Sequence, residues 1–311
     1  MSTVAALLIA VSAVALVRWW DDSDMTLRLG RHSFSDDRRL MMAIVNRTPD
    51  SFYDKGATWS EDKALDRVGQ VVDEGAEIVD IGGIKAAPGE EIDVDEEMRR
   101  TVRFVERVRS AHPEVVVSVD TWRAQVGRAV CEAGADLLND AWGGADPALV
   151  DVAAAYDVGI VCTHTGGVAP RTRPHRIEYA DVVASAVADT TAYAERALAA
   201  GVARESIVID PAHDFGKTTQ DSLDLTRRLD ELVATGWPVL VSLSNKDFVG
   251  ESLDLPVGER LTGTLAASAI ATLHGARIFR VHEVTETRQV VDMVDVICGR
   301  RPPVRTIRGR A

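Results

Sequence analysis

Short apolar runs rich in β-branched residues alternate with helical periodicity along most of the chain. Eight such runs cover residues 42–46, 78–83, 115–120, 137–140, 160–164, 207–210, 239–244 and 277–282. Between the runs, apolar residues recur at helical spacing. Strands that alternate with helices form βα units, which build a parallel sheet. Eight such units predict one α/β domain, a (β/α)8 barrel over about residues 41–299.

The segments between the runs carry the signals of helices and of helix ends. We expect helices near residues 60–74, 93–111, 122–132, 147–156, 179–200, 220–234, 258–273 and 286–297. Glycine often ends a helix because it adopts the left-handed conformation without strain. We therefore predict helix-ending glycines at the bottom of the barrel: Gly75, Gly134, Gly159, Gly201, Gly236 and Gly275.

Several of the predicted strands end on side chains capable of polar chemistry. These are Asn46, Asp120, Asn139, Asp210 and His282, with Lys246 just past the seventh run. The carboxyl ends of barrel strands meet at one rim, where enzymes of this architecture hold their active sites. The sequence therefore predicts one polar site at that rim.

Purely structural roles remain possible explanations for some of the polar residues. An aspartate at a strand end, such as Asp120 or Asp140, can serve only to cap the helix that follows. His164 and His213 can equally be ligand contacts or buried histidines with structural partners. These alternatives apply to single residues and explain the whole set less well.

The two ends of the chain fall outside the barrel pattern. Residues 1–37 form an N-terminal extension that we do not expect to belong to the core. Its apolar stretch at residues 4–17 is too short to span a bilayer as a helix and lacks the positive start of a signal peptide. A helix packed on the body and a membrane anchor remain alternatives. Residues 38–300 are the expected barrel, and residues 301–311 read as a basic solvated tail.

Composition narrows the classes of partner. The 311 residues are 46% hydrophobic, enough for a large single core, and the formal net charge is −13. Nucleic acids and anionic membranes need a basic surface, so we expect neither as a partner. The three cysteines fit neither a disulfide framework nor a zinc cluster. A reducing, cytoplasmic location is the simplest expectation.

The strand ends carry motifs that resemble those of one enzyme family, the dihydropteroate synthases. The similarity covers about residues 41–299, in order and at each expected strand. The matching segments are Asn46-Arg47-Thr48-Pro49-Asp50-Ser51-Phe52, Asp80-Ile81-Gly82-Gly83, Ser118-Val119-Asp120-Thr121, Asn139-Asp140, Asp210-Pro211, Phe215-Gly216-Lys217-Thr218, Ser244-x-Lys246 and Arg280-Val281-His282.

This resemblance implies a reaction and a set of roles. In the family, 4-aminobenzoate attacks 7,8-dihydropterin-6-ylmethyl diphosphate, giving dihydropteroate and pyrophosphate with the help of Mg²⁺. Catalysis would then depend on Lys246, Asp210 and Arg280. The remaining roles, by resemblance, are pterin binding by Asp120, Asn139, Asp210, Lys246 and Phe215, diphosphate binding by Arg280, His282 and Lys85, second-substrate binding by Ser244 and Pro88, and metal binding by Asn46.

One loop departs from the family pattern. Where the family carries Gly-Gly-Glu-Ser-Thr-Arg-Pro-Gly, this chain reads Gly82-Gly83-Ile84-Lys85-Ala86-Ala87-Pro88-Gly89. The threonine and arginine that serve the diphosphate and the aminobenzoate are alanines here. Lys85 can replace the charge, but not the planar, two-pronged geometry of arginine.

Three functional hypotheses follow. The first is a dihydropteroate synthase-like transferase of folate biosynthesis with an unusual loop. The second is a paralogue that binds a pterin but has lost or altered the transfer reaction, and the third is a pterin-dependent methyltransferase barrel. The family resemblance also predicts a homodimer built from the last helices, in which the small-residue segment 265–273 would take part.

Overall fold

The computed structural model describes residues 26–47, 60–84, 91–171 and 177–308. Eight parallel strands form its central sheet, in the order β8, β7, β6, β5, β4, β3, β10, β9. Their bounds are β3 Leu40–Asn46, β4 Ile78–Gly82, β5 Val116–Asp120, β6 Leu137–Asp140, β7 Gly159–Thr163, β8 Ile207–Asp210, β9 Leu240–Val241 and β10 Ile278–Val281.

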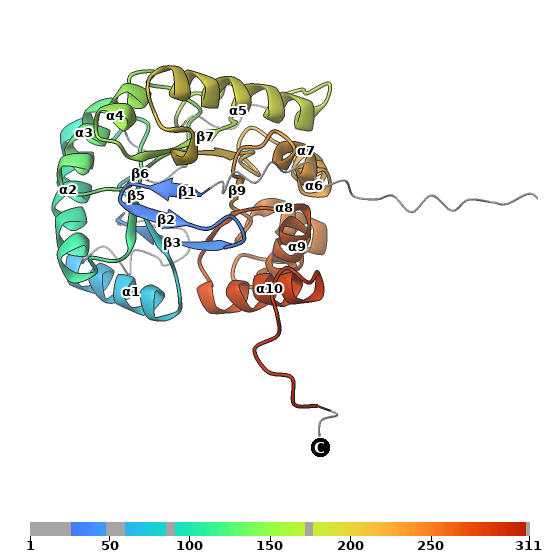
Figure 1. Cartoon of the computed structure of the whole chain (residues 1–311). Helices are drawn as coiled ribbons and strands as arrows, with labels where there is room; N and C mark the ends of the chain where they lie inside the picture. The colour runs from blue at the N-terminus through green and yellow to red at the C-terminus, as the bar shows by residue number, and fades with distance from the viewer. Residues whose placement is uncertain (1–25, 48–59, 85–90, 172–176, 309–311) are drawn as a thin grey trace, which may run out of the picture.

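The two edges of this sheet meet and close it into a barrel. Ile209 of β8 forms a parallel bridge with Val239, and its amide donates to the carbonyl of Pro238 at 2.9 Å. Figure 1 shows the helices as a ring around the strands. The predicted (β/α)8 barrel is confirmed, and all eight strands overlap their expected ranges.

The helices lie close to their expected positions. They are α1 Glu61–Asp73, α2 Val94–Ala111, α3 Ala124–Glu132, α4 Leu149–Ala155, α5 Val182–Ala199, α6 Thr219–Arg227, α7 Leu229–Val233, α8 Asp247–Leu253, α9 Leu261–His274 and α10 Val284–Ile297. The helix expected over residues 220–234 is divided at Arg228, where the backbone leaves helical geometry, into α6 and α7. The short α8 and a 3-10 turn, Arg204–Ser206, were not expected.

Five of the six predicted helix-ending glycines adopt the left-handed conformation. Gly75, with φ of 98°, and Gly275, with φ of 102°, illustrate the pattern. The prediction is wrong for Gly159, which is the first residue of β7. In the turn before β7, the residue with the left-handed conformation is Asp157, with φ of 53°. A Cβ at Gly159 would lie 2.9 Å from Leu137 and 3.0 Å from Leu29, so close packing is what requires glycine there.

A short hairpin closes the bottom of the barrel. Strand β1 (Leu27–Leu29) pairs with β2 (His32–Phe34) in antiparallel register, and Figure 1 shows the pair lying across the barrel. Leu27 and Leu29 are buried in one apolar cluster with the first residues of the barrel strands. The expectation that residues 1–37 lie outside the core is therefore wrong for this hairpin. Residues 1–25, with the apolar stretch 4–17, lie outside the described residues.

Two further expectations concern the thiols and the chain ends. All three cysteines are free thiols, as their spacing predicted. Residues 301–308 of the tail are exposed and form no helix or strand. Within the described ranges, none of the helices combines the length and apolar character needed to cross a membrane.

The hairpin should contribute measurably to the stability of the barrel. Leu29 is completely buried, so Leu29→Ala should lower the free energy of unfolding by about 2–5 kcal/mol, because it leaves a cavity in the barrel floor. Urea denaturation measures the change. Ser33→Ala, an exposed change on the same hairpin, is the control and should stay within about 0.5 kcal/mol of the unmodified protein. Equal stability of the two variants would show that the hairpin does not support the core.

Candidate active site

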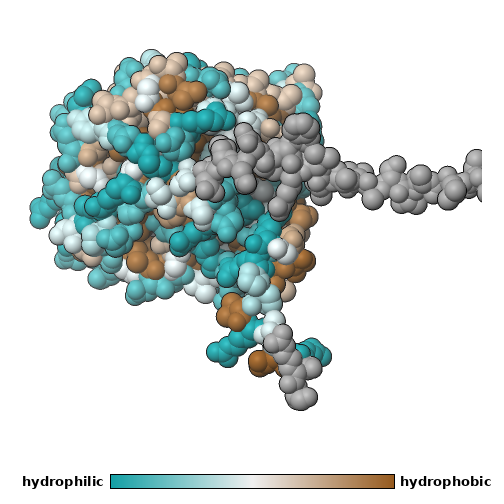
Figure 2. Space-filling view, viewed as in Figure 1, coloured by the Kyte–Doolittle hydropathy of each residue, from teal (hydrophilic) through white to brown (hydrophobic). Residues whose placement is uncertain are grey.

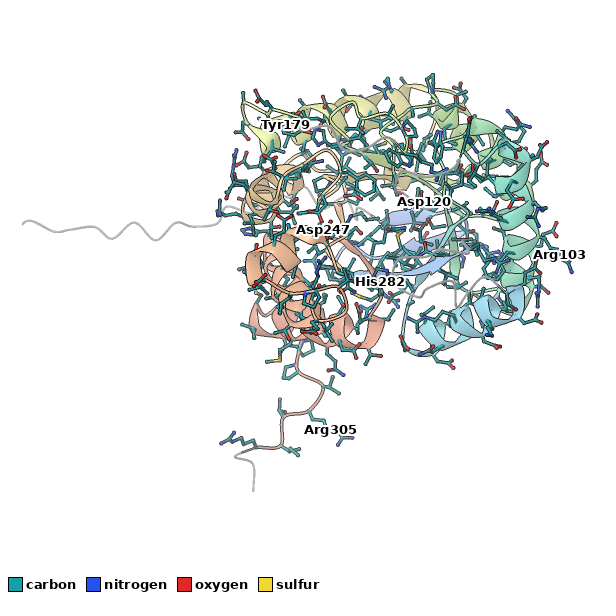
Figure 3. All side chains as sticks on the ribbon, turned by 180° about the vertical axis from the view of Figure 1, so that it is seen from behind. Arg103, Asp120, Tyr179, Asp247, His282 and Arg305 are labelled. Atoms are coloured by element: carbon teal, nitrogen blue, oxygen red, sulfur yellow. The ribbon has the colours of Figure 1, made fainter. Side chains whose placement is uncertain are left out.

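The candidate site lies at the carboxyl ends of the barrel strands. Asp120 ends β5, Asn139 lies on β6, Asp210 ends β8 and Arg280 lies on β10. In Figure 3, which views the molecule from behind, Asp120 and His282 lie over the interior of the ring, whereas Arg103 lies on its outer edge. The fold thus brings these side chains to one rim, as the sequence predicted.

A buried aspartate within β4 organises the centre of this site. The Asp80 carboxylate accepts hydrogen bonds from Ser118 Oγ at 2.6 Å and Asn139 Nδ2 at 3.1 Å. Arg280 Nε donates to the same carboxylate at 2.7 Å. Sequence reasoning quoted Asp80 only as part of a motif and gave it no role. The signal was present, because a charged residue inside a fully buried strand needs compensating partners.

Arg280 also reaches a second carboxylate, that of Asp120. Its Nη2 lies 3.2 Å from Asp120 Oδ2. Burial raises the pKa of Asp120 to about 7, even though the positive charge of Arg280 acts in the opposite direction. Nearby Asp80 adds to the increase, because two close carboxylates resist ionising together. Asp120 therefore changes its protonation state near neutral pH.

A second group of residues lies between β8 and β9. Asp210 Oδ1 accepts the amide of Ala212 at 2.7 Å, and burial raises the pKa of Asp210. Lys246 Nζ lies 4.7 Å from the centre of the Phe215 ring, in cation–π range. Burial lowers the pKa of Lys246. The Phe215 ring is also packed against a second aromatic side chain. Trp142 contacts it edge-on, with 5.4 Å between the ring centres.

Lys217 is a further cation that sequence reasoning did not select. Its Nζ donates to the carbonyl oxygens of His164 at 3.0 Å and Phe215 at 2.8 Å. Burial lowers the pKa of Lys217 to about 7. Through these two carbonyl groups, Lys217 fastens the loop that carries Phe215.

Ser244 and His282 form a third group on the rim. Ser244 Oγ lies 2.9 Å from His282 Nδ1 and 2.9 Å from Glu283 Oε2. Asn245 Nδ2 also donates to Glu283, at 3.2 Å. Burial lowers the pKa of His282 to about 4, so its ring is neutral at physiological pH. The imidazole can then exchange a hydrogen bond but supplies no positive charge.

The other predicted site residues divide into described and undescribed positions. Asn46 ends β3 and pairs in register with Gly82 of β4, so its side chain belongs to the same rim. Lys85 and Pro88 lie outside the described residues, as do Ala86 and Ala87. No group of three or more histidine, cysteine, aspartate or glutamate side chains within the described ranges is arranged to hold a metal ion.

The residues left open by the sequence have structural partners. Asp140 accepts hydrogen bonds from Tyr193 Oη at 2.6 Å and from the amides of Trp142 and Gly144, so it fastens the loop after β6. His164 Nε2 lies 3.1 Å from Ser185 Oγ. His213 Nε2 lies 3.2 Å from Thr226 Oγ1. Burial lowers the pKa of both histidines to about 3.

A surface groove of about 760 Å³ lies away from this rim. It is lined by Leu65, Asp66, Gly69, Gln70, Asp73, Glu74, Ala111, His112 and Thr285, which come mainly from α1 and the end of α2. None of the strand-end residues reaches it. The chemistry is concentrated at the barrel mouth instead, so the groove is not the active-site candidate.

The fold and this rim together define a parallel barrel with polar side chains at the carboxyl ends of its strands, and comparison with known proteins identifies the class. A family model described as pterin binding enzyme matches residues 42–282. The chain belongs to this family.

Within the family, the protein is dihydropteroate synthase-like. It is 60% identical over 279 residues to inactive dihydropteroate synthase 2 of Mycobacterium tuberculosis (strain ATCC 25618 / H37Rv), covering 88% of each chain. It is 38% identical over 266 residues to the dihydropteroate synthase of Bacillus subtilis (strain 168), covering 85% of this chain and 90% of that one. A solved structure of the Xanthomonas albilineans dihydropteroate synthase in complex with 7,8-dihydropteroate superposes with a TM-score of 0.77 and 32% identity, over 88% of this chain and 98% of that one.

The raised pKa of Asp120 has a testable effect on stability. The folded protein holds the Asp120 proton more tightly than the unfolded chain between the ordinary value of 3.8 and about 7. Protonation therefore favours the folded state, and this contribution is lost as pH rises through that window. Asp120→Asn removes this titrating group, so only the unmodified protein loses the contribution as pH rises. The unfolding free energy of the variant minus that of the unmodified protein should therefore increase from pH 4 to pH 8.

Urea denaturation of both proteins at a series of pH values measures this difference. The buried histidines contribute equally to both proteins and cancel in the subtraction. Asp151→Asn, an exposed change on the outer side of the barrel, is the matched control and should not reproduce this shift in favour of the variant. A difference that stays constant with pH for Asp120→Asn would contradict the raised pKa.

Proposed function

We propose that this protein binds a pterin in the barrel mouth and performs the dihydropteroate synthase transfer slowly or not at all. The observation that carries the proposal is the convergence of Asp120, Asn139, Asp210 and Lys246 on one rim beside the Phe215 ring. The bound product in the Xanthomonas albilineans synthase supports a pterin as the ligand class.

The side chains of the rim suit a pterin ring. Such a ring presents an amino-pyrimidinone edge with alternating donors and acceptors, which carboxylates and an amide can pair with in a dry pocket. Asp210 and Asp120 would accept from the ring, and Asn139 can do both because its amide is a donor and an acceptor. Lys246 would donate to the ring while Phe215 forms an apolar wall.

The transfer chemistry would occur at the edge of the ring-binding site. The aniline nitrogen of 4-aminobenzoate would attack the exocyclic methylene carbon, the carbon–oxygen bond to the diphosphate would break, and the nitrogen would lose a proton. Arg280 would stabilise the departing diphosphate through its positive charge, and His282 and Ser244 lie on the same rim. Ser244 and Pro88 are the proposed contacts of the second substrate.

The described residues fit Mg²⁺ only as an ion that receives most of its oxygen ligands from the diphosphate of the substrate. Mg²⁺ prefers oxygen ligands and is often bound through one or two protein groups together with substrate phosphates. Asn46 offers one amide oxygen at the rim, and the described residues add no acidic cluster around it. Mg²⁺ bound by Asn46 and the diphosphate would neutralise charge on the leaving group.

The substitutions in the loop over residues 84–89 argue that the transfer step is impaired. Alanine at positions 86 and 87 neither donates a hydrogen bond nor carries charge. Loss of one charged contact in the transition state costs on the order of 3 kcal/mol, or about 100-fold in rate. The relative from Mycobacterium tuberculosis, which is named an inactive synthase, supports the same conclusion.

We also propose a homodimer through the last two helices. Ile270 and Leu273 of α9 and Met293 and Ile297 of α10 are large apolar side chains exposed to solvent. Figure 2 shows apolar surface at the edge of the molecule where these helices lie. Contact between two copies would bury this surface, which is rarely left open in a monomer. Light scattering of the purified protein distinguishes a dimer from a 33.6 kDa monomer.

Binding of a pterin should depend on Asp210. Calorimetry with 6-hydroxymethyl-7,8-dihydropterin should show binding to the unmodified protein. Asp210→Ala should abolish it or weaken it by about 1–3 kcal/mol or more, because ligand donors are left without acceptors in a buried pocket. Asp224→Ala, on the outer surface of α6, is the control and should bind normally. Absence of binding to the unmodified protein would refute the proposal.

Restoring the family loop should raise turnover. Ala86→Thr combined with Ala87→Arg returns the hydrogen bond and the charge that the family places near the diphosphate, so pyrophosphate release in the presence of 4-aminobenzoate should increase, by up to about 100-fold. Lys85→Ala should weaken binding of the pterin diphosphate more than binding of the pterin alcohol. If Lys85→Ala affects both ligands equally, Lys85 does not contact the diphosphate.

A further inference from the structure

The loop after β8 and the segment after β9 are joined by one aspartate, Asp214. Helix α8 begins at Asp247, and its N-cap position is Lys246, whose side chain makes no capping hydrogen bond. The carboxylate of Asp214 takes that place from another part of the chain. Asp214 Oδ2 accepts the amide of Asp247 at 2.6 Å and the amide of Phe248 at 3.4 Å.

Asp214 is itself held from the opposite side by α6. Its Oδ1 accepts a hydrogen bond from Ser222 Oγ at 3.1 Å. The backbone amide of Asp214 donates to Ser222 Oγ, also at 3.1 Å. The Asp214 backbone has φ of 69°, a left-handed conformation that favours glycine. An aspartate at this position therefore carries backbone strain that glycine would avoid.

The contacts of Asp214 tie its carboxylate to the backbone that directly follows Lys246. The residue after Asp214 is Phe215, whose ring lies under Lys246 Nζ at 4.7 Å. The residue after Lys246 is Asp247, whose amide Asp214 binds. One carboxylate therefore joins the loop that carries Phe215 to the segment that carries Lys246. The charged or titratable groups that influence Lys246, or that it influences, are Asp214, Arg280, Asp210, Asp247, Lys217, His213 and His282.

We propose that Asp214 is a positioning residue that joins the loop of Phe215 to the segment of Lys246 and so holds the Lys246 ammonium group over the Phe215 ring for donation to the ligand. The consequence for the pterin rests on the proposed function, whereas the effect on Lys246 does not. Burial lowers the pKa of Lys246, and Asp214 is the foremost of the carboxylates that counter this effect. Without the Asp214 charge, Lys246 would lose its proton at a lower pH.

The composition of the chain makes this measurable. It contains only five lysines, Lys55, Lys63, Lys85, Lys217 and Lys246. Reductive methylation with ¹³C-formaldehyde labels each of them, and NMR titration of the methyl signals gives the midpoint for each side chain. Lys246→Arg identifies the Lys246 signal by its absence. Lys63, exposed on α1, is an internal reference far from the rim.

Two variants separate the charge of Asp214 from its shape. Asp214→Asn keeps an oxygen that can cap α8 but removes the charge, so the Lys246 midpoint should fall by about one pH unit or more while Lys63 stays unchanged. Asp214→Gly removes the cap and also the strained side chain. It should shift Lys246 at least as far with little change in melting temperature, because the two effects on stability oppose each other.

Asp181→Asn is the matched control. Asp181 caps α5 through the amides of Val183 and Ala184, and it lies far from Lys246 along the chain. It should leave the Lys246 midpoint in place. An unchanged Lys246 midpoint in Asp214→Asn, or an equal shift in Asp181→Asn, would overturn the proposal.

Calorimetry with 6-hydroxymethyl-7,8-dihydropterin completes the test. The alkaline limit of pterin binding should move to lower pH in Asp214→Asn, so that affinity at pH 8 falls several-fold while affinity at pH 6 changes less. A uniform loss at both pH values would indicate a structural role only and would count against the proposal. If the unmodified protein binds no pterin, the proposed function fails, while the Lys246 titration still decides the role of Asp214.

Discussion

The buried carboxylate of Asp80 is the constraint on which the site depends. A charge within a barrel strand is costly unless hydrogen bonds and an opposite charge compensate it. Ser118 from β5, Asn139 from β6 and Arg280 from β10 supply that compensation. One charge on β4 thus fixes side chains on three other strands. Two of these side chains, Asn139 and Arg280, are proposed ligand contacts. The geometry of the rim is therefore tied to the stability of the barrel.

Arg280 is shared between this structural task and a ligand. Its guanidinium group has five donors, and the contacts with Asp80 and Asp120 leave others for an anion. An incoming diphosphate still has to compete with two carboxylates for one positive charge. Because the pKa of Asp120 lies at about 7, the proton on Asp120 decides whether Arg280 faces one negative charge or two. The contact between Arg280 and Asp120 thus links the proposed diphosphate site to the proposed pterin site.

The sequence predicted the strands and most helices because these segments contain enough residues to show the hydrophobic periodicity of a strand or a helix. It missed the hairpin of β1 and β2, whose three-residue strands carry too little pattern, and α8, whose cap comes from Asp214 in a distant loop. At the site, the strand-end residues were predictable because parallel strands deliver their carboxyl ends to one rim. Asp80 was not selected because it lies inside an apolar run, and the network that explains it comes from three other strands. Lys217 was quoted only as part of the motif Phe215-Gly216-Lys217-Thr218, and its carbonyl partners are visible only in the fold.

The coupling of site and core offers a physical reason why the two halves of the family pattern have diverged unequally. Replacing Arg280 would break the buried ion pair with Asp80, which costs about 3–5 kcal/mol, a large part of the stability of a domain. Replacing Asn139 would remove one hydrogen bond to the same carboxylate. Such residues are retained by folding whether or not the protein turns over substrate. The described partners of Asp80 come from β5, β6 and β10, so alanine at positions 86 and 87 leaves all three of them in place. A loss of the transfer reaction, as proposed for this chain, would therefore be compatible with changes at positions 86 and 87 but not with changes at Asn139 or Arg280.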